Sequence, residues 1–543
     1  MKKCFILVLL LTLVMTMQVF AGGNNQSSGT TKAAAAAPEA NFNPTGYPIV
    51  KNNITLTAAA RLRPAHTTKF EDMIFMKQVM AKTNITLNIT SALAGSGLDE
   101  KRNLMFASND LPDFFFPTFG LWDRLSEYGQ LGQLIPMEGL IDKYGDNIKK
   151  IWAKFPKAKA NSYDTISGHI YATPQMFDMP YTPASDDLFI NKRWLDALGL
   201  PVPTTIDEFT NDLRAFKKMT PEQSGYQKTI LFTFRNQDVQ NNFEQLYAAF
   251  GAPYLYNGPS TNAQPSYMGL KDGKPYFIAT TPEFKAATQW LRTLAQEGLL
   301  DIEAFTHTAA EFTAKTSNPD VGIGSFVCWS VENAMGVGKP NDYYAFIPVL
   351  QGPAGKVQRY MDRSFARGAG FAISGKNQHP EATMRLIDYF YDDEIGIQAA
   401  YGDIGTHIEK IDDNHYRFMP TPAGIAYNTF RFSQAFEEWW VNWDKLQFND
   451  SDAQKVPRFQ QKVPYFAPYY PNVQFSPEQS QARSTLATDI ENYVQQMQAK
   501  WIVQGGIENE WDAYVAKIND MGLDKLMQIY NDAYQQYLKF SQQ

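Results

Sequence analysis

The chain has 543 residues, of which 44% are hydrophobic and 19% are charged, and its formal net charge is −7. This length predicts more than one hydrophobic core, because single cores stop growing at about 250–300 residues. The acidic balance argues against nucleic acid as a partner, since a nucleic-acid-binding surface needs clustered positive charge.

The first residues have the pattern of a secretion signal. Lys2 and Lys3 precede an apolar stretch, residues 5–17, and Ala21 stands where a signal peptidase would cut. The apolar stretch is too short for a resident membrane helix, and no later stretch reaches the roughly 18 uninterrupted apolar residues of a membrane span. We therefore predict a signal peptide over residues 1–21 and an exported mature protein.

The segment after the signal is predicted to be a flexible leader. Residues 22–45 are small and polar and include prolines, so they offer too little apolar surface to offset the entropy lost on ordering. The chain has two cysteines, Cys4 and Cys328, and the first leaves with the signal. No disulfide framework is therefore expected in the mature protein.

The first folded segment reads as strand, helix, strand. Residues 53–59 and 83–90 alternate and are rich in β-branched residues, and a helical pattern lies between them. A further helix is predicted around residues 101–107. The run Phe114 to Phe116 then reads as a buried strand that Pro117 ends. The loop after a parallel strand is where open α/β sheets place their ligands.

The stretch over residues 185–217 has the clearest local signals. A short apolar run, residues 188–190, stops at Asn191, a good N-cap for the short helix that follows. Thr205 and Glu208 form the T-x-x-E capping box of a second helix. The apolar residues of this second helix fall on one face at helical spacing: Ile206, Phe209, Leu213 and Phe216.

The second half of the chain alternates strands with helices. Strands are predicted over residues 229–234, 320–329 and 343–350, a hairpin and helix over residues 271–305, and a strand, turn and helix over residues 368–396. Helices with apolar faces end the chain and carry Trp511, Tyr514, Leu526, Tyr530 and Tyr534.

Several strings resemble one protein family in the same order along the chain. WLDALGLPVPTTIDEF follows the run at residues 188–190, NDLPDFFFP resembles the family motif S-G-D-L-P-D, and GHIYATP resembles a hinge motif. The resemblance is to extracellular solute-binding proteins of bacterial ABC importers, family 1-like, in the large sugar-binding subgroup of the lipoprotein LplA type. It covers nearly all of residues 46–540.

The resemblance implies an α/β fold of the periplasmic-binding-protein type. Two α/β lobes are expected, joined by a multi-strand hinge, with the ligand in the cleft between them. We expect the first lobe to comprise residues 46–172 plus 363–405, and the second lobe residues 173–362 plus 406–543. The chain would then cross between the lobes near residues 172, 362 and 405.

Two departures from the family pattern carry predictions. Relatives often bear a lipid on a cysteine at the cleavage site, whereas Gly22 and Gly23 stand there in this chain, so we predict a periplasmic protein without that anchor. Many relatives also carry a D-x-N-x-D-like calcium loop, but residues 219–227 lack its carboxylates. We predict no calcium at that loop and no metal or cofactor elsewhere.

Motifs of the common enzyme classes are missing from the sequence. H-E-x-x-H, G-x-S-x-G and Walker A strings do not occur, and the six histidines never fall at metal-ligand spacing. The expected protein is therefore a binding protein and not an enzyme. A glycosidase needs only two facing carboxylates, however, so a secreted carbohydrate-active enzyme with an aromatic cleft stays an alternative. A peptide-binding protein is the other.

Aromatic residues give the positive signal for a sugar site, with 37 Phe, 28 Tyr and 10 Trp. Sugars present apolar C–H faces and hydroxyl rims, which suit flat aromatic platforms with planar polar side chains at the edge. The candidate ligand-binding residues lie mainly in loops after predicted strands: Arg61, Arg63, Phe119, Trp122, Gln175, Arg235, Asn236, Trp329, Arg363, Trp439 and Trp440.

Three groups of these residues are candidates for specific reasons that go beyond their place after a strand. Trp329 ends a predicted strand at a position that resembles a stacking tryptophan of maltose-binding proteins. Trp439 and Trp440 would point about 100° apart on a helix, so one of them is expected to reach the cleft or its rim. Arginines could hold a uronate carboxylate through a bidentate fork. The predicted function is capture of an oligosaccharide, uronate-containing or not, by a monomer that delivers it to ABC permease subunits.

Overall fold

The computed structural model describes residues 40–62, 68–93, 96–121, 124–173, 175–176, 187–234, 243–257, 264–336, 343–360, 370–420, 431–432, 439–448, 450–471 and 473–541. Contacts divide the chain into two units, Met1–Ala40 and Asn41–Gln543. The fold described below is that of the second unit. The predicted signal peptide and most of the predicted leader lie outside the described residues.

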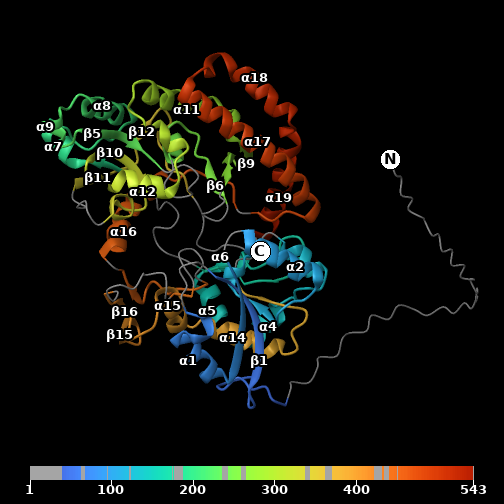
Figure 1. Cartoon of the computed structure of the whole chain (residues 1–543). Helices are drawn as coiled ribbons and strands as arrows, with labels where there is room; N and C mark the ends of the chain where they lie inside the picture. The colour runs from blue at the N-terminus through green and yellow to red at the C-terminus, as the bar shows by residue number, and fades with distance from the viewer. Residues whose placement is uncertain are drawn as a thin grey trace, which may run out of the picture. The chain divides into compact units, whose positions relative to one another are not determined.

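The first sheet has four strands in the order β14-β3-β1-β2. One of them, β1, is labelled in Figure 1. Its strands are β1 (Ile54–Leu62), β2 (Ile85–Leu93), β3 (Phe114–Phe115) and β14 (Ala372–Ile373). β1 pairs in parallel with both β2 and β3, whereas β14 runs antiparallel to β3. The predicted strand, helix, strand unit at the start of the chain is confirmed.

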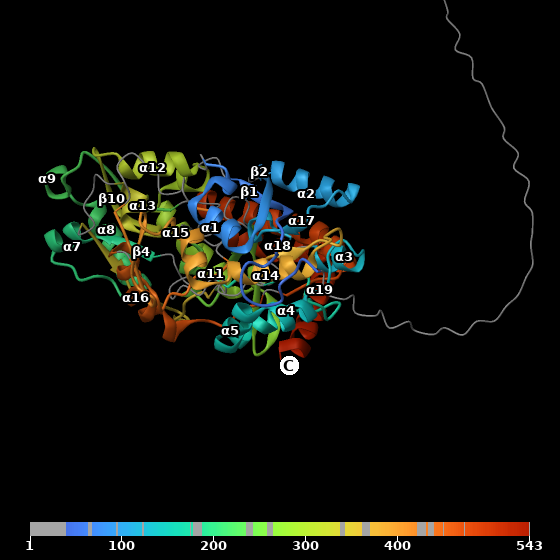
Figure 2. The ribbon, with the colours of Figure 1, turned by 90° about the horizontal axis from the view of Figure 1, so that it is seen from below.

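Helices and a small three-stranded sheet complete this part of the protein, which we call the first lobe. They are η1 (Phe70–Asp72), α1 (Ile74–Thr83), α2 (Ser96–Ser108), η2 (Pro117–Phe119), α3 (Leu125–Gln130), α4 (Glu138–Tyr144), α5 (Asp146–Lys154), α6 (Pro156–Ala160), α14 (Pro380–Phe390), α15 (Asp393–Tyr401), β15 (Ile408–Asp412), β16 (His415–Phe418) and β17 (Leu446–Gln447). α14 packs on α4 and α5, and Figure 2 shows α14 close to α4. One apolar cluster joins these helices to β1 and β3.

Asp388 ties α14 to the start of α5. Its Oδ1 accepts hydrogen bonds from the backbone N–H groups of Asn147 and Ile148, at 2.9 and 3.0 Å. These N–H groups lie in the first turn of α5, where the helix itself supplies no acceptor. Burial raises the pKa of Asp388 to about 6, although the two N–H donors oppose the rise. The carboxylate thus caps a helix at an electrostatic cost.

This pKa predicts a pH-dependent stability that Asp388→Asn should remove. Because the folded-state pKa lies above the usual value of 3.8, the folded protein holds the proton more tightly, and stability falls as pH rises from about 4 to 6. The loss should reach about 3 kcal/mol. Asparagine keeps the Oδ1 acceptor without the charge, so urea unfolding of the variant should show a flatter dependence between pH 4 and 7.

Exposed Asp142 supplies the matched control, since Asp142→Asn on the neighbouring α4 should leave the pH dependence of stability unchanged. Parallel stability curves for wild type and Asp388→Asn would contradict the assignment.

The second sheet also has four strands, in the order β11-β4-β10-β5. They are β4 (Asp187–Asn191), β5 (Lys228–Thr233), β10 (Val321–Cys328) and β11 (Tyr344–Ile347). β10 is parallel to β5 and antiparallel to β4, and β11 is antiparallel to β4. The strands predicted over residues 188–190, 229–234, 320–329 and 343–350 are confirmed.

We call the second sheet with its helices and hairpins the second lobe. The elements up to residue 280 are α7 (Lys192–Leu198), α8 (Ile206–Lys217), α9 (Pro221–Ser224), α10 (Glu244–Ala248), β6 (Leu255–Asn257), β7 (Gln264–Ser266), β8 (Met268–Lys271), β9 (Lys274–Phe277) and η4 (Ile278–Thr280). After residue 280 come α11 (Pro282–Gln296), η5 (Ile302–Phe305), α12 (Ala309–Ser317), α13 (Val331–Met335), β12 (Gln351–Gly352), β13 (Gly355–Lys356), α16 (Asp450–Lys462), η7 (Val463–Tyr465), α17 (Pro477–Gln504), α18 (Ile507–Asp520) and α19 (Leu523–Ser541).

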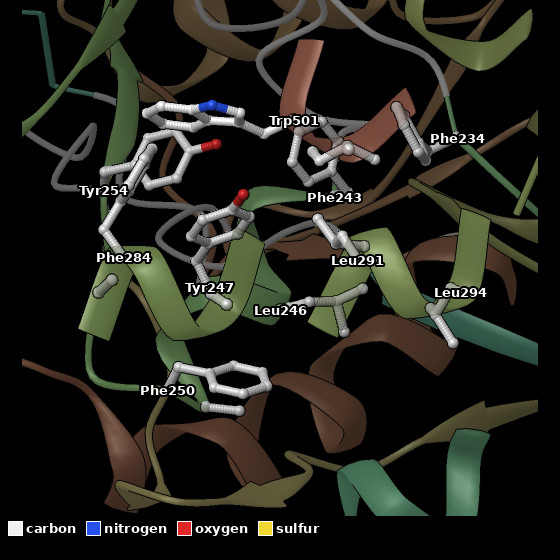
Figure 3. Packing of buried hydrophobic residues seen from close by; sticks show 14 of the residues in the cluster. Phe234, Phe243, Leu246, Tyr247, Phe250, Tyr254, Phe284, Leu291, Leu294 and Trp501 are labelled. Atoms are coloured by element: carbon white, nitrogen blue, oxygen red, sulfur yellow. The ribbon is translucent and has the colours of Figure 1, made fainter. Parts of the chain in front are cut away.

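Aromatic residues fill the core of the second lobe. Figure 3 shows the indole of Trp501 in α17 beside Tyr254 and Tyr247. Trp501 is fully buried and donates its Nε1 hydrogen to Glu510 Oε2 at 2.8 Å. α17 packs along α11, which links the C-terminal helices to the helices of the second sheet. The apolar faces predicted for these C-terminal helices are confirmed, because all five aromatic and leucine residues named for them are buried.

Local capping signals are confirmed in detail. The Asn191 side chain accepts from the N–H of Trp194 at 3.1 Å and starts α7. Thr205 and Glu208 make both hydrogen bonds of the capping box at the start of α8. All four apolar residues predicted for the inner face of α8 are buried. These signals depend on neighbouring residues alone, which explains why they could be read without a structure.

The predicted leader is too long at its C-terminal end. Phe42 is buried in the first-lobe cluster and meets the ring of Tyr144 edge-on, with centroids 5.3 Å apart. Arg385 of α14 donates to the carbonyl oxygens of Asn43 and Gly46, at 2.6 and 2.7 Å. One aromatic anchor and one arginine therefore order residues that composition alone assigns to a flexible segment.

The packing also disagrees with the lobe boundary placed at residues 405 and 406. Ile408, Tyr416 and Leu446 form a cluster with Ile397 and Tyr401 of α15. The β15–β16 hairpin thus buries Ile408 and Tyr416 against a helix of the first lobe. The described residues of β15, β16 and β17 belong with that lobe, and the third connection follows Gln447 instead of lying near residue 405. The other two connections include residues 177–186 and 361–369, which are outside the described residues.

Across the described residues, none of the helices has both the length and the apolar character needed to cross a membrane.

Candidate functional site

The first candidate surface is the edge of the first sheet at which its parallel strands end. Arg61 is the last residue but one of β1, and Pro117 follows β3. β14 runs the opposite way and therefore begins at this edge. Just before β14, Phe371 exchanges hydrogen bonds with Thr173, whose N–H donates to the Phe371 oxygen at 2.9 Å. Gln175, two residues further on, thus comes to the edge that holds Arg61.

The second candidate surface is the matching edge of the second sheet. Parallel strands β5 and β10 end there, and antiparallel β4 begins there, since Asp187 pairs with Cys328. β11 ends at the same edge, because Ile347 pairs with Leu188. Trp329, the residue after β10, therefore stands where carboxyl ends of strands meet, which is the usual place for a ligand in an open α/β sheet.

Five predicted ligand-binding residues cannot be placed. Arg63, Trp122, Arg235, Asn236 and Arg363 lie outside the described residues. Their assignment to the site stays a prediction.

The expectation that Phe119 or one of Trp439 and Trp440 presents a ring to the ligand is wrong for the described structure. Phe119 is 0% exposed and packs on Phe115, with ring centroids 5.5 Å apart. Trp439 and Trp440 are 1% and 3% exposed. They do not lie on a helix, and Trp440 forms a bridge with Met176. No face of these rings is left for a sugar.

Each tryptophan of this pair has its own buried partner. Trp439 donates its Nε1 hydrogen to the Phe390 oxygen at 2.8 Å, and Trp440 donates to Asp393 Oδ1 at 2.8 Å. Consecutive side chains of an extended segment point to opposite sides, and here both sides are covered. The helical geometry assumed from sequence would have exposed one of them.

Trp329 is only partly buried and has a cation over its ring. The Nζ of Lys455 in α16 lies 3.9 Å from the centre of the indole ring. Trp329 also packs in a small apolar cluster with Trp443, Phe448, Val456 and Phe459. The sequence identified Trp329 but gave no reason to connect it with α16, because α16 is more than a hundred residues away.

A buried ionic cluster lies at the same edge of the second sheet. Asp187 accepts from Arg458 Nε at 2.7 Å, and its other oxygen is 2.7 Å from Lys462 Nζ. The side chains of Asp187 and Lys462 are only 4% and 3% exposed. The cations also lie over aromatic rings, Arg458 over Phe189 and Lys462 over Phe346. One carboxylate thus fixes two cations of α16.

A second ionic network lies at the end of β5. Thr233 donates its hydroxyl to Asp301 Oδ2 at 2.9 Å, and Lys315 lies 2.8 Å from both Asp301 and Glu303. Burial opposes the charge of Lys315, but its hydrogen bonds to the two carboxylates raise its pKa. Lys315 therefore stays charged and is already neutralised by its neighbours.

A small pocket opens at this edge and adds a candidate that the sequence did not reveal. It is lined by Leu188, Phe346 and Lys462, together with the amides of Gln245 and Gln358. Gln245 Nε2 is buried and has no hydrogen-bond partner among the described residues. A buried donor without a partner is costly unless something accepts from it. No sequence signal distinguished Gln245 from the other glutamines of the chain.

Metal ligands do not cluster within the described parts of the chain, where no group of three His, Cys, Asp or Glu side chains could hold an ion. Residues 219–227, the position of the calcium loop in relatives, form α9 and its flanks. The Thr220 and Gln223 side chains cap α9 reciprocally. Glu222 is thus the single carboxylate that this segment could offer to a metal ion.

We accordingly expect isothermal titration of the metal-stripped protein to show no calcium uptake in the micromolar range. Micromolar binding would contradict this, and Glu222→Gln, which neutralises the one carboxylate of that segment, would then test whether the ion sits there.

Comparison with known proteins identifies relatives over nearly the whole chain. A family described as bacterial extracellular solute-binding protein matches residues 75–408. The fructooligosaccharide ABC transporter substrate-binding protein FusA of Streptococcus pneumoniae is 29% identical over 508 residues, which cover 89% of this chain and 90% of FusA.

Solved structures agree with the sequence comparison. FusA in complex with kestose superposes with a TM-score of 0.73 at 27% identity, covering 90% of this chain and all of FusA. An extracellular solute-binding protein from Bifidobacterium longum subsp. infantis gives a TM-score of 0.78 at 23% identity, covering 91% of this chain and 100% of that chain. The fold is therefore of the periplasmic-binding-protein type, as predicted.

Proposed function

The chain belongs to the family of bacterial extracellular solute-binding proteins, and from this premise we propose that it captures an oligosaccharide outside the cytoplasm and passes it to an ABC permease. The observation that carries the proposal is the similarity to FusA, which spans both chains almost completely. The placement of Trp329 and Arg61 at the carboxyl ends of strands supports it, because this is where an α/β fold receives ligands. Gln175, which is 6% exposed, reaches the edge that holds Arg61 through the bonds of Thr173 to Phe371.

Capture requires contacts from both lobes. A ligand can favour a closed form only if it binds that form more tightly than the open one. Arg61 and Gln175 from the first lobe and Trp329 from the second would provide such contacts, and hinge motion of the three connecting segments would bring them together. Of the three, Trp329 offers the apolar platform and the other two offer planar polar groups.

The ligand we propose is a neutral oligosaccharide of the fructooligosaccharide class. FusA is named for such sugars. The charges of the second lobe also favour a neutral ligand, because Arg458, Lys462 and Lys315 are already paired with carboxylates. A uronate-containing sugar is the alternative that the sequence suggested, and it would depend on Arg61 and Arg63 or on Arg363.

A thermal-shift panel tests the ligand class. Kestose, nystose, a melibiose-type galactoside, trigalacturonate and a mixed peptide pool would be compared at matched concentrations. We expect kestose or nystose to raise the melting temperature in a concentration-dependent way, since a ligand that binds only the folded state stabilises it by mass action. A response to trigalacturonate alone would support the uronate reading, and a response to peptides alone would contradict sugar binding.

The enzyme alternative has a direct assay. Prolonged incubation with the sugar that gives the largest shift, followed by chromatography of the products, should return the sugar intact. New reducing ends, or released monosaccharide, would show that the chain cleaves its ligand.

We further propose that the protein works in the periplasm as a monomer after removal of residues 1–21. Mass spectrometry of the protein isolated from its host should give a mature chain that begins at Gly22 without a lipid. Light scattering should give the mass of one chain.

A further inference from the structure

We propose that Lys455, held in place by Asp187, positions Trp329 for the ligand by covering one face of its indole. This inference rests on the proposed function and adds residues that act through Trp329 without touching sugar themselves. It is carried by the geometry of α16 against the second sheet. Lys455, Arg458 and Lys462 lie three and four residues apart along α16, and this spacing puts all three on one face of the helix.

This face of α16 is fixed by charge as well as by apolar contact. Arg458 and Lys462 both pair with Asp187, the first residue of β4, and each lies over an aromatic ring of the sheet. Asp187 stands opposite Cys328 in the strand pairing, one residue before Trp329. The Asp187 carboxylate therefore holds α16 against the end of β10. Trp329 is the next residue after β10.

Lys455 is the residue of this face that reaches Trp329. Its side chain is buried, 4% exposed for the whole residue, and its Nζ lies 3.9 Å from the ring centre. A cation over an indole face is attracted by the ring quadrupole and holds the ring in one plane. Because the ammonium takes one face of the indole, a sugar ring can stack only on the other face.

We expect Lys455 to help binding by fixing the orientation of the Trp329 ring. A stacking platform whose plane is fixed before binding loses less conformational freedom when the sugar arrives. Val456 and Phe459 of α16 belong to the same small apolar cluster as Trp329. Trp329 would thus be held by one helix that enters the lobe directly from the third connection.

The test compares Lys455→Met with Lys455→Arg. Methionine keeps the apolar length without the charge, whereas arginine keeps a cation that stacks well on indole. We expect Lys455→Met to weaken binding of the best sugar by about 3- to 10-fold and Lys455→Arg by less than about 2-fold. Gln454→Met, on an exposed position of the same helix, serves as the control and should leave affinity unchanged.

A double-mutant comparison separates positioning from general structural loss. In a Trp329→Phe background, Lys455→Met should cost less than about 2-fold, because its effect acts through the indole. An equal loss in both backgrounds, or no loss in either, would overturn the proposal.

A second measurement does not need a ligand. With 5-fluorotryptophan incorporated, the ¹⁹F resonance of Trp329, assigned by its loss in Trp329→Phe, should shift in Lys455→Met. It should also shift in Asp187→Asn/Lys462→Met, which removes one charge of each sign and so avoids leaving both cations of the cluster without an anion. An unmoved resonance would overturn the structural half of the proposal whether or not a sugar is known.

The two measurements together distinguish the two proposals. If wild type binds none of the sugars while the resonance shifts as expected, the proposed function fails and the Lys455–Trp329 arrangement stands as a purely structural one. If wild type binds sugar and the resonance shifts but affinity does not change, the function stands and the positioning role is refuted.

Discussion

Replacing Trp439 with alanine is expected to lower the free energy of unfolding by about 3–5 kcal/mol, the usual cost of deleting a large buried aromatic side chain. The indole is 1% exposed and packs among Phe116, Phe371, Phe390 and Phe432, with ring centroids 5.3–6.2 Å away. Its Nε1 also donates to the Phe390 oxygen at 2.8 Å, so the variant leaves a buried acceptor without its donor. Denaturant titration followed by far-ultraviolet circular dichroism would measure the loss.

Sugar affinity should change little for the folded fraction of Trp439→Ala. The residue lies in the core of the first lobe and presents no face to a ligand. Trp439→Phe is the matched control, because it keeps a ring in the cluster and should cost clearly less. A variant of near wild-type stability that has lost sugar binding would contradict the burial of Trp439 and restore it as a binding residue.

Replacing Trp329 with alanine is expected to have the opposite profile, with sugar affinity reduced by about 1–3 kcal/mol if the ring stacks on the ligand. Trp329 lies after β10 at the edge where β5 and β11 also end, and it is only partly buried. Isothermal titration with the best sugar of the panel would measure the change in affinity.

The free energy of unfolding of Trp329→Ala tests whether Trp329 is a stacking platform for the ligand or a residue of the hydrophobic core. The ring contacts a small peripheral cluster, so we expect a smaller loss in unfolding free energy than for Trp439→Ala. Trp443→Phe, in the same cluster, is a useful comparison because it changes the packing without removing the proposed platform. Unchanged affinity together with a large fall in stability would assign Trp329 to packing.

These two tryptophans show why residue type alone did not locate the site. Both were candidates because aromatic residues suit sugars. Their difference depends on which residues surround them: phenylalanines that include Phe390 of α14 enclose Trp439, whereas Trp329 is only partly buried and has Lys455 of α16 over its ring. No local pattern carries that information, since the partners are tens to hundreds of residues apart.

The glycines of β10 also have a reason that local sequence patterns do not contain. The sequence predicted a Gly-rich apolar strand over residues 320–329, and β10 is that strand. The structure supplies the reason for two of the glycines. A Cβ on Gly322 would meet the rings of Trp194 and Tyr226 within 2.8 Å, and one on Gly324 would meet the Leu231 oxygen at 2.6 Å. Close packing of the Trp194 and Tyr226 rings on the sheet demands a glycine at 322, and the backbone of the neighbouring strand β5 demands one at 324.

The sequence by itself determined the elements whose signals are local. Asn191, Thr205 and Glu208 cap their helices through bonds to residues three positions away, and alternating or helical apolar patterns placed the strands and helices around them. Sequence motifs that resemble those of a known family then indicated the family and, through it, the fold.

Only the tertiary structure decided which side chains are covered and where the chain changes lobes. Burial of Phe42, Phe119 and Trp440 depends on surfaces that distant segments supply, as does the attachment of β15 and β16 to α15. The pairing of Asp187 with α16 joins residues about 270 positions apart. Such contacts exist only once the chain has folded, because their free energy comes from burying groups that sequence neighbours cannot cover.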